Sequence, residues 1–566
     1  MNRSRCPVAR RPSLLLLALL PAVLLVSGCG ERIDDGHDLT PGAVRAAARV
    51  IGLELTAAER EQMLPDLVEQ REMERKLRAL DLANAERPAV VFDPVLPGMT
   101  VDVPDRPPRW SDPGSVRRPA DPDSLAFLTV GELSRLIHTG RLTSRELTEL
   151  CLARLARHDS TLHCVVQLTP AIARRQAARA DSLLAAGVDL GPLHGIPYGV
   201  KDLLAVRGTR TTWGAAPYRD RTLDATATVV RRLEAAGAVL CAKLSLGALA
   251  MGDVWFGGRT RNPWRPEQGS SGSSAGPASA VAAGLLPFAV GSETWGSIVS
   301  PATRCGVTGL RPTFGRVPRT GAMALSWTMD KLGPIARCVE DAVMVLDAIR
   351  GPDGADPTVR DAPLPYTPAV DWRALRIGYL ADDFAAEDSL GRTLDLAALD
   401  VLRSLGARLE PVAWPDVDPE PLSLVLTAEA AAAFSDLTLS GRDDLLTMQK
   451  RWSWPNTFRA ARFIPAVAYI QANRARMRLM RGMDRLLRRV DLLVAPAWQG
   501  HNLLITNLTG HPCVVVPDGF TAPDQPHSIT FVGRLFDEAT IAAVARAYQE
   551  ATGFHRWYPP RYCGRR

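Results

Sequence analysis

Apolar residues recur at helical spacing in two well-separated parts of the chain. Between residues 40 and 84, the run LTAAEREQMLPDLVEQREMERKLRALDL predicts helices, and Thr56 and Glu59 have the spacing of a capping box. From Leu125, the run LAFLTVGELSRLIHTGRLTSRELTELCLARLARHD predicts two amphipathic helices. Each of these begins with its own capping-box pair, Thr129/Glu132 and Thr143/Glu146.

Short apolar runs then alternate with helical stretches as far as the C-terminus. The strand candidates are GIPYGV, AVLCAK, FAVGSE, LRIGYL, DLLVAPA and PCVVVP. This alternation predicts an α/β fold with a large central sheet. Residues 85–122 are instead rich in Pro and Asp and predict an extended connector. Together with the helical residues 40–84, this connector is either a spacer between an anchor and the main body or a clasp lying over that body.

The N-terminal 29 residues have the features of an export signal. Four arginines precede the apolar run SLLLLALLPAVLLVSGCG, which is short and interrupted by proline. Small residues lead to Cys29, a pattern similar to the bacterial lipoprotein box, in which this cysteine is lipidated. We therefore expect an exported protein, anchored to a membrane of the bacterial envelope and facing the periplasm or exterior. A plain signal peptide, an uncleaved anchor and twin-arginine export through Arg10 and Arg11 are alternatives.

Composition excludes several classes of function. The formal net charge is only +6 in 566 residues, and the arginines are scattered without interleaved aromatic residues, so we expect no nucleic-acid partner. The nine cysteines lack CxxC spacing, and no HExxH motif occurs. We therefore expect no metal, no cofactor and no disulfide framework.

The stretch GSSGSSAGPASAVAAG, residues 269–284, leads into a helix-forming alanine run, so it is predicted as a loop at a helix N-terminus rather than a linker. A phosphate-binding P-loop is excluded, because no lysine occurs between Lys243 and Lys331. Within the loop, Ser274 satisfies GxSxG, which leaves a serine esterase as an alternative. Its base would be one of His501, His511, His527 and His555.

Two further residues are candidates for catalysis. Ser297 follows a predicted strand and a glycine turn, where successive N–H groups can point at one oxygen. Lys201 follows the apolar run GIPYGV and is one of five lysines in a chain that otherwise uses arginine. A lysine, unlike an arginine, can lose its proton, so Lys201 is either a base or a salt-bridge partner.

Several separated motifs resemble the amidase signature family in order and spacing. They are GIPYGVKD, RNPWRP followed by GSSGSSAG, VGSETWGSIVSPA, CGVTGLRPTFGRV and MDKLGPIARCVEDA, with weaker matches in NLTGHPCVVVPDGF and FVGRLFDEATI. The resemblance covers roughly residues 125–555. It implies the amidase signature fold, a large mixed sheet flanked by helices, and hydrolysis of an amide carbon–nitrogen bond.

The resemblance also implies roles for individual residues. Lys201 would be the base, Ser273 the bridging serine and Ser297 the nucleophile that forms an acyl-enzyme. The peptide between Gly272 and Ser273 would be cis. The N–H groups of the oxyanion hole would come from Thr294, Trp295, Gly296 and Ser297.

Trp295 stands where the family usually has glycine, so a non-catalytic, surface-anchored binding protein is a further hypothesis. Export and the absence of an arginine two residues after Ser297 disfavour the glutamine-hydrolysing component of a tRNA amidotransferase. They favour a neutral, fairly apolar small-molecule or peptide amide as substrate. Five aromatic residues either line such a pocket or belong to the core: Trp255, Phe256, Trp264, Trp295 and Trp327.

These observations divide the chain into a signal peptide with a lipoprotein box at 1–29, a helical and Pro-rich spacer at 30–122, and an amidase catalytic domain at 123–560. The sequence leaves the oligomeric state open, with a homodimer as one option.

Overall fold

The computed structural model describes residues 39–386 and 389–563, so the predicted signal peptide and Cys29 lie outside the described residues. Contacts divide the chain into two compact units, Met1–Ala79 and Leu80–Arg566. The first unit contains α1 (Pro41–Val50), α2 (Ala57–Gln62) and α3 (Leu64–Arg78). The capping box at Thr56 and Glu59 is confirmed, because both of its hydrogen bonds are present at the start of α2.

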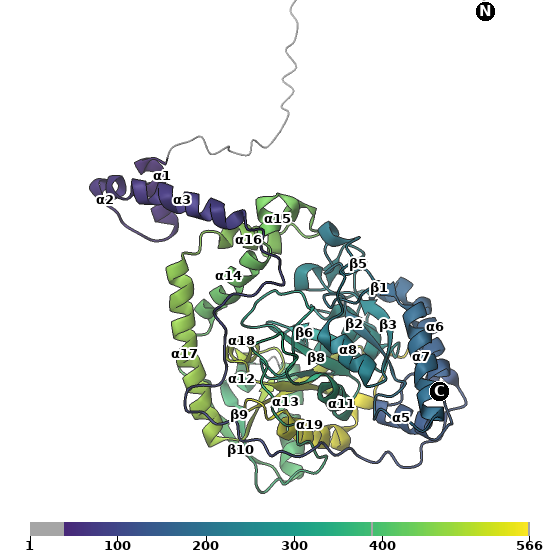
Figure 1. Cartoon of the computed structure of the whole chain (residues 1–566). Coiled ribbons are helices and arrows are strands. Elements are labelled where there is room, and N and C mark those ends of the chain that lie inside the picture. The colour runs from purple at the N-terminus through teal and green to yellow at the C-terminus, as the bar shows by residue number, and fades with distance from the viewer. Residues whose placement is uncertain (1–38, 387–388, 564–566) are drawn as a thin grey trace, which may run out of the picture. The chain divides into compact units, whose positions relative to one another are not determined.

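An eleven-stranded mixed sheet forms the centre of the second unit, in the order β1-β3-β2-β6-β8-β7-β12-β13-β11-β9-β10 (Figure 1). The strands are β1 (Val165–Leu168), β2 (Pro197–Lys201), β3 (Val239–Leu244), β4 (Val254–Trp255), β5 (Gly258–Arg259), β6 (Phe288–Glu293), β7 (Thr308–Arg311), β8 (Lys331–Ala336), β9 (Arg376–Leu380), β10 (Arg408–Val412), β11 (Leu492–Pro496), β12 (Cys513–Ala522) and β13 (Gln525–Gly533). Strands β4 and β5 form a separate two-stranded ribbon. All six strand candidates of the sequence lie in the large sheet, which confirms the predicted α/β class.

Helices flank this sheet (Figure 1). The α-helices described in the second unit are α4 (Pro122–Leu125), α5 (Val130–His138), α6 (Ser144–Leu162), α7 (Pro170–Ala185), α8 (Thr228–Ala235), α9 (Ala275–Ala282), α10 (Val299–Cys305), α11 (Val339–Ile349), α12 (Ala381–Ala386), α13 (Ser389–Ser404), α14 (Leu424–Ala433), α15 (Ser435–Leu439), α16 (Trp454–Ala461), α17 (Ala466–Arg489), α18 (Asn502–Thr509) and α19 (Glu538–Thr552). Helices α5 and α6 begin with the two remaining capping boxes, as predicted.

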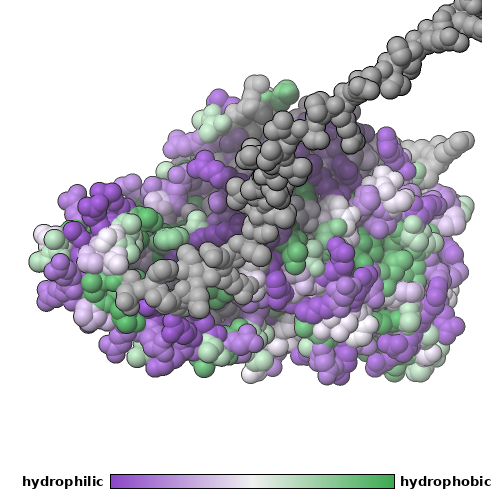
Figure 2. All heavy atoms as spheres, turned by 90° about the horizontal axis from the view of Figure 1, so that it is seen from above, coloured by the Kyte–Doolittle hydropathy of each residue, from purple (hydrophilic) through white to green (hydrophobic). Residues whose placement is uncertain are grey.

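The most deeply buried helix is α9, which contacts β2, β3, β6 and β8 and whose eight residues are all buried. Its composition explains this position, since alanine, glycine and serine let the helix backbone approach the sheet closely. The face of the molecule in Figure 2 is mainly hydrophilic, with scattered hydrophobic residues. Within residues 39–386 and 389–563, no helix combines the length and the apolar character that a bilayer crossing requires.

Residues 80–122 begin the second unit and have almost no regular structure, yet they pack against the rest of that unit. Phe92 packs edge-on against Phe314, with ring centroids 5.0 Å apart. Further along, the Arg109 N–H donates to the carbonyl of Tyr366 at 2.8 Å. For residues 85–122, these contacts fit the clasp rather than the spacer.

Candidate active site

Two neighbouring parallel strands bring the central residues of the site together. Strands β2 and β6 pair in register, with Val200 opposite Val290, so their carboxyl ends meet at one edge. Strand β2 ends at Lys201, and β6 ends at Glu293. Because adjacent parallel strands end side by side, residues more than 90 positions apart in the chain come into contact at this point.

Lys201 is completely buried and surrounded by hydroxyl groups. Its Nζ donates hydrogen bonds to the Oγ atoms of Ser273 at 2.8 Å, Ser292 at 2.9 Å and Ser274 at 3.1 Å. Burial lowers the pKa of Lys201 well below its ordinary value, and the negative charges of Asp330 and Glu293 only partly oppose this. The lysine is thus held in a setting that favours its neutral form.

The salt-bridge role that the sequence left open for Lys201 is found at Lys243 instead. Its Nζ lies 2.6 Å from a carboxylate oxygen of Asp202, and both side chains are fully buried. No carboxylate within the described residues forms such a pair with Lys201.

The peptide between Gly272 and Ser273 is cis, in the arrangement that the family resemblance implies. A side chain at position 272 would have its Cβ 1.9 Å from the carbonyl oxygen of Gly252, so only glycine fits this close backbone approach. The loop therefore brings the Ser273 hydroxyl to Lys201 while α9 begins directly after Ser274.

Ser274, the GxSxG serine, is a structural residue here. Its Oγ accepts from the Ser292 N–H at 3.1 Å and donates to the Ser292 carbonyl at 3.0 Å, and the side chain has no exposed surface. Among the residues that the structure describes, no histidine bonds to it, and no strand leads directly into it as a nucleophile elbow requires. The geometry therefore disfavours the esterase alternative.

Ser297 lies in the loop between β6 and α10 and is half-buried. Its carbonyl accepts from the Ser274 N–H at 3.1 Å, which joins the two serine loops. In the described part of the chain no hydrogen bond links the Ser273 and Ser297 hydroxyls directly. The structure thus brings Lys201 and Ser273 into contact and places Ser297 in the adjoining loop.

The backbone of residues 294–297 leaves four N–H groups available. None of them donates a hydrogen bond within residues 39–386 and 389–563. The positive φ of this turn, 92°, falls on Gly296 and not on Trp295, so the tryptophan is accommodated without a left-handed backbone. The tryptophan residue is 45% exposed. The Thr294 side chain is held by donation to an Asp330 carboxylate oxygen at 2.6 Å.

Glu293 is a positioning residue whose role the sequence analysis missed. Its carboxylate accepts from the N–H groups of Ile298 and Val299 at 2.8 and 3.0 Å and pairs with Arg311 at 2.6 Å. Burial opposes ionisation, but Arg311, the amide of Asn507 and these N–H groups outweigh it and lower the pKa of Glu293 to about 2. The buried Glu293 carboxylate therefore connects the residue before the 294–297 turn to the two residues after it.

Replacing Glu293 with glutamine should destabilise the fold, because it leaves the Arg311 guanidinium buried without a counter-charge. We expect a loss of about 3 kcal/mol in the free energy of unfolding at pH 7. The stabilisation from a lowered carboxylate pKa is complete above about pH 4.5 and is lost as the pH falls toward 2, so wild type and variant should converge on acidification.

Urea unfolding between pH 7 and pH 3 measures this difference. The matched control is Glu234→Gln, which changes an exposed carboxylate on α8 and should shift the free energy of unfolding by less than about 0.5 kcal/mol. Equal stability of wild type and Glu293→Gln at pH 7 would contradict the assigned role.

A cavity of about 560 Å³ adjoins the site on the side of Ser292 and Thr294. Of the five aromatic residues that the sequence offered as pocket lining, only Trp327 lines this cavity. Trp255 and Phe256 pack on each other at 4.9 Å, and Trp264 packs on Phe520. Trp255 is buried, as the core interpretation expects, whereas Phe256 and Trp264 are only partly buried.

Comparison with known proteins identifies the family. Residues 146–503 match the Amidase family. The chain belongs to the amidase signature family. It is thus a hydrolase that acts on amide carbon–nitrogen bonds, and the observed mixed sheet is the fold of solved amidase structures.

Individual relatives cover most of the chain. One component of the glutamyl-tRNA(Gln) amidotransferase of Roseiflexus castenholzii is 36% identical, covering 77% of this chain and 98% of the relative. The peptide amidase of Stenotrophomonas maltophilia is 31% identical with a TM-score of 0.67, covering 76% of this chain and 98% of that structure. An amidase family protein of Bacillus anthracis is 26% identical with a TM-score of 0.68, covering 78% and 93%.

Proposed function

We propose that this amidase hydrolyses a neutral, fairly apolar amide through an acyl-enzyme on Ser297, with Ser273 and Lys201 as a proton relay. Neutral Lys201 takes the proton of the Ser273 hydroxyl, and Ser273 takes that of Ser297. The Ser297 oxygen then attacks the amide carbon.

The same relay completes the reaction in reverse. Ser273 returns a proton to the leaving nitrogen, the carbon–nitrogen bond breaks and the amine departs. Water then gives a proton to the relay and attacks the ester carbon of acyl-Ser297. The carboxylic acid leaves, and Ser297 regains its proton.

The observation that carries this proposal is the environment of Lys201. A completely buried amine, 2.8 Å from Ser273 and without a carboxylate partner, is held ready to accept a proton. Lys243, by contrast, is paired with Asp202, and the buried Lys331 donates to the Met329 carbonyl. Lys201 is the buried lysine that three serine hydroxyls surround.

The free N–H groups of residues 294–297 support the second half of the proposal. Negative charge develops on the amide oxygen in the transition state, and preorganised backbone donors stabilise it without reorganisation. No acceptor within the described residues occupies them, so they are open to a substrate oxygen. Trp295 supplies its N–H as a glycine would.

The substrate class follows from charge. Val299, two residues after Ser297, is fully buried and offers no charge to a substrate carboxylate. The charged groups that line the cavity are already engaged: Arg87 and Arg319 with Asp356 at 2.6 and 3.2 Å, and Asp330 with Thr294. A neutral amide therefore suits the site better than a free amino acid does, because the amino acid brings charged amino and carboxylate groups.

A serine-reactive fluorophosphonate tests the proposal on the detergent-solubilised full chain. Mass spectrometry should locate the adduct on Ser297, and the Lys201→Ala variant should not be labelled. An adduct on Ser274 would favour the esterase, and a folded protein that is not labelled would favour a non-catalytic binding protein.

We also propose that the enzyme is exported and lipid-anchored through Cys29, on the strength of the apolar run and the small residues before that cysteine. Bacteria expressing the protein and fed an alkynyl fatty acid should incorporate the label. The Cys29→Ala variant should lose it and the matched Cys6→Ala variant should keep it. Labelling that persists in Cys29→Ala would contradict the anchor.

A further inference from the structure

The segment Asn84–Val91, called the strap here, borders the cavity next to the site. The cavity is lined by six strap residues: Asn84, Ala85, Arg87, Pro88, Ala89 and Val91. Its other walls include Met323, Leu325 and Trp327, and it extends to Ser292 and Thr294. The Ser292 hydroxyl accepts from Lys201 Nζ at 2.9 Å, so the cavity runs from the strap to the surroundings of the proposed base.

Asn84 holds the first end of the strap. Its side-chain amide donates to the carbonyls of Ala324 at 2.9 Å and Ala433 at 3.1 Å, and its Oδ1 accepts from the Ala324 N–H at 2.8 Å. An extended segment without regular structure is thereby attached to the loop that forms the opposite wall.

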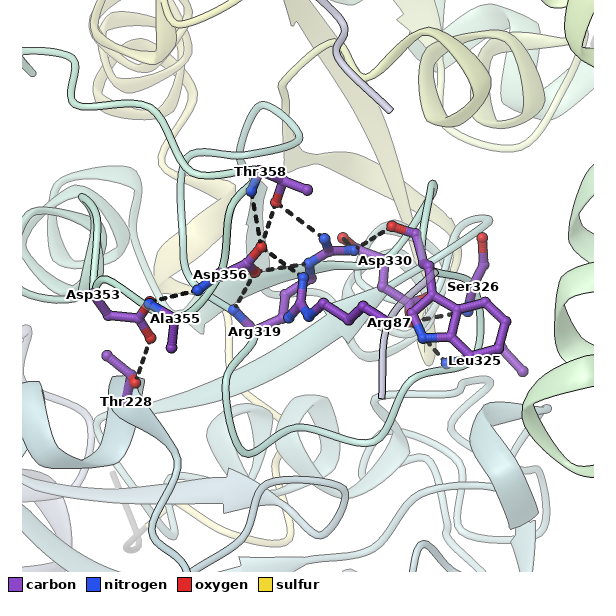
Figure 3. Close-up of polar contacts among 11 residues, drawn as sticks. Arg87, Thr228, Arg319, Leu325, Ser326, Asp330, Asp353, Ala355, Asp356 and Thr358 are labelled. Atoms are coloured by element: carbon purple, nitrogen blue, oxygen red, sulfur yellow. Dashed lines mark hydrogen bonds and ion pairs between the residues drawn. The ribbon is translucent and has the colours of Figure 1, made fainter. Parts of the chain in front are cut away.

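Arg87 holds the middle of the strap (Figure 3). Its guanidinium pairs with Asp356 at 2.6 Å, and the same carboxylate accepts from the backbone N–H and the side chain of Arg319. Asp356 has a fully buried side chain, whereas Arg87 is about one-quarter exposed. The Arg87 guanidinium is therefore paired with Asp356, a carboxylate that it shares with Arg319.

The remaining strap residues that line the cavity form its solvent-facing rim. Ala85, Pro88, Ala89 and Val91 are all exposed, and all are apolar. After the strap, Phe92 packs against Phe314 and beneath the guanidinium of Arg476 at 3.7 Å. The strap is thus held at both ends while its small apolar side chains face the cavity opening.

We propose that the strap is the specificity-determining wall of this amidase: it limits how far the apolar part of a neutral amide extends from the reacting carbon. This inference rests on the proposed function, since it takes the cavity as the substrate site. The strap lies outside the matched family region at 146–503, so a segment outside that region would select among substrates for the catalytic residues within it.

Filling the rim tests the proposal. In Ala89→Trp, the indole should occupy space that long substrates need. The variant is assayed with two series of anilides, one that lengthens the acyl group and one that lengthens a substituent on the aniline ring. Each series gives the ratio of kcat/KM for long over short amides. We expect this ratio to fall about tenfold in at least one series.

The matched control is Val90→Trp, the same substitution one residue away. Val90 is 83% exposed and does not line the cavity in the described structure, so its ratio should stay at the wild-type value. Asn84→Ala, which frees the strap from Ala324 and Ala433, should raise the ratio severalfold, because a loosened wall accepts longer substrates.

The outcomes separate the two proposals. If the wild-type enzyme is labelled at Ser297 and the ratio in Ala89→Trp equals the wild-type ratio in both series, the strap inference alone is overturned. An equal fall for Ala89→Trp and Val90→Trp also overturns it. Absence of Ser297 labelling in wild type overturns the proposed function itself.

Discussion

Replacing Ser297 with alanine should lower kcat for an amide by at least about 10⁴-fold and leave the free energy of unfolding within about 0.5 kcal/mol. The loss is large because no acyl-enzyme can form without the Ser297 oxygen, whereas the N–H groups of the turn remain in place. Stability should hold because the side chain is half-buried and its backbone carbonyl, which bonds to the Ser274 N–H, is unchanged. Single-turnover kinetics and urea unfolding measure the two quantities.

Ser300→Ala is the matched control. This serine lies three residues further along, is also half-buried, and contacts the Ser271 hydroxyl at 2.8 Å without touching Lys201. Its variant should retain kcat within a few fold. Unchanged turnover in Ser297→Ala would remove Ser297 as the nucleophile.

Replacing Lys201 with methionine should have the second-largest effect, a loss of about 10³-fold or more in kcat/KM. Because burial lowers the pKa of Lys201, the wild-type rate should rise with pH as the ammonium form loses its proton and should level off well below the ordinary pKa of 10.5. The methionine variant has no proton to lose at this position, so that rising limb should disappear. The pH dependence of kcat/KM checks both expectations.

The fold should tolerate this change. The unfolded chain holds the Lys201 proton at pH values where the folded chain has released it, so the lysine lowers stability below about pH 10.5, and its cost shrinks as the pH rises. Methionine removes this cost, and the free energy of unfolding at pH 7 should not fall by more than about 1 kcal/mol. Lys450→Met, on an exposed segment, is the control with wild-type kinetics. A Lys201→Met variant that keeps the rising limb would assign the titration to another group.

Much of the local structure was predictable because its causes are local. The capping boxes that begin α2, α5 and α6 depend on residues three positions apart, and the apolar runs of β2, β3 and β6 depend on neighbours in the chain. The family motifs likewise occur as contiguous letters, so Lys201 and Ser297 could be named before any fold was known. The α/β class and the catalytic candidates were therefore accessible from sequence alone.

The properties of the site were decided by tertiary structure. The sequence placed Glu293 beside the 294–297 turn but contained nothing to show that Arg311 and Asn507 would converge on it. Nor did it show that β2 and β6 would pair in parallel, which buries Lys201 among three serine hydroxyls and lowers its pKa. The strap is a third case, because Asn84 meets Ala324 across 240 residues. The sequence by itself determined which groups are present and which local elements carry them. Burial, charge pairing and pocket shape arise from contacts between distant segments, so only the folded chain decided them.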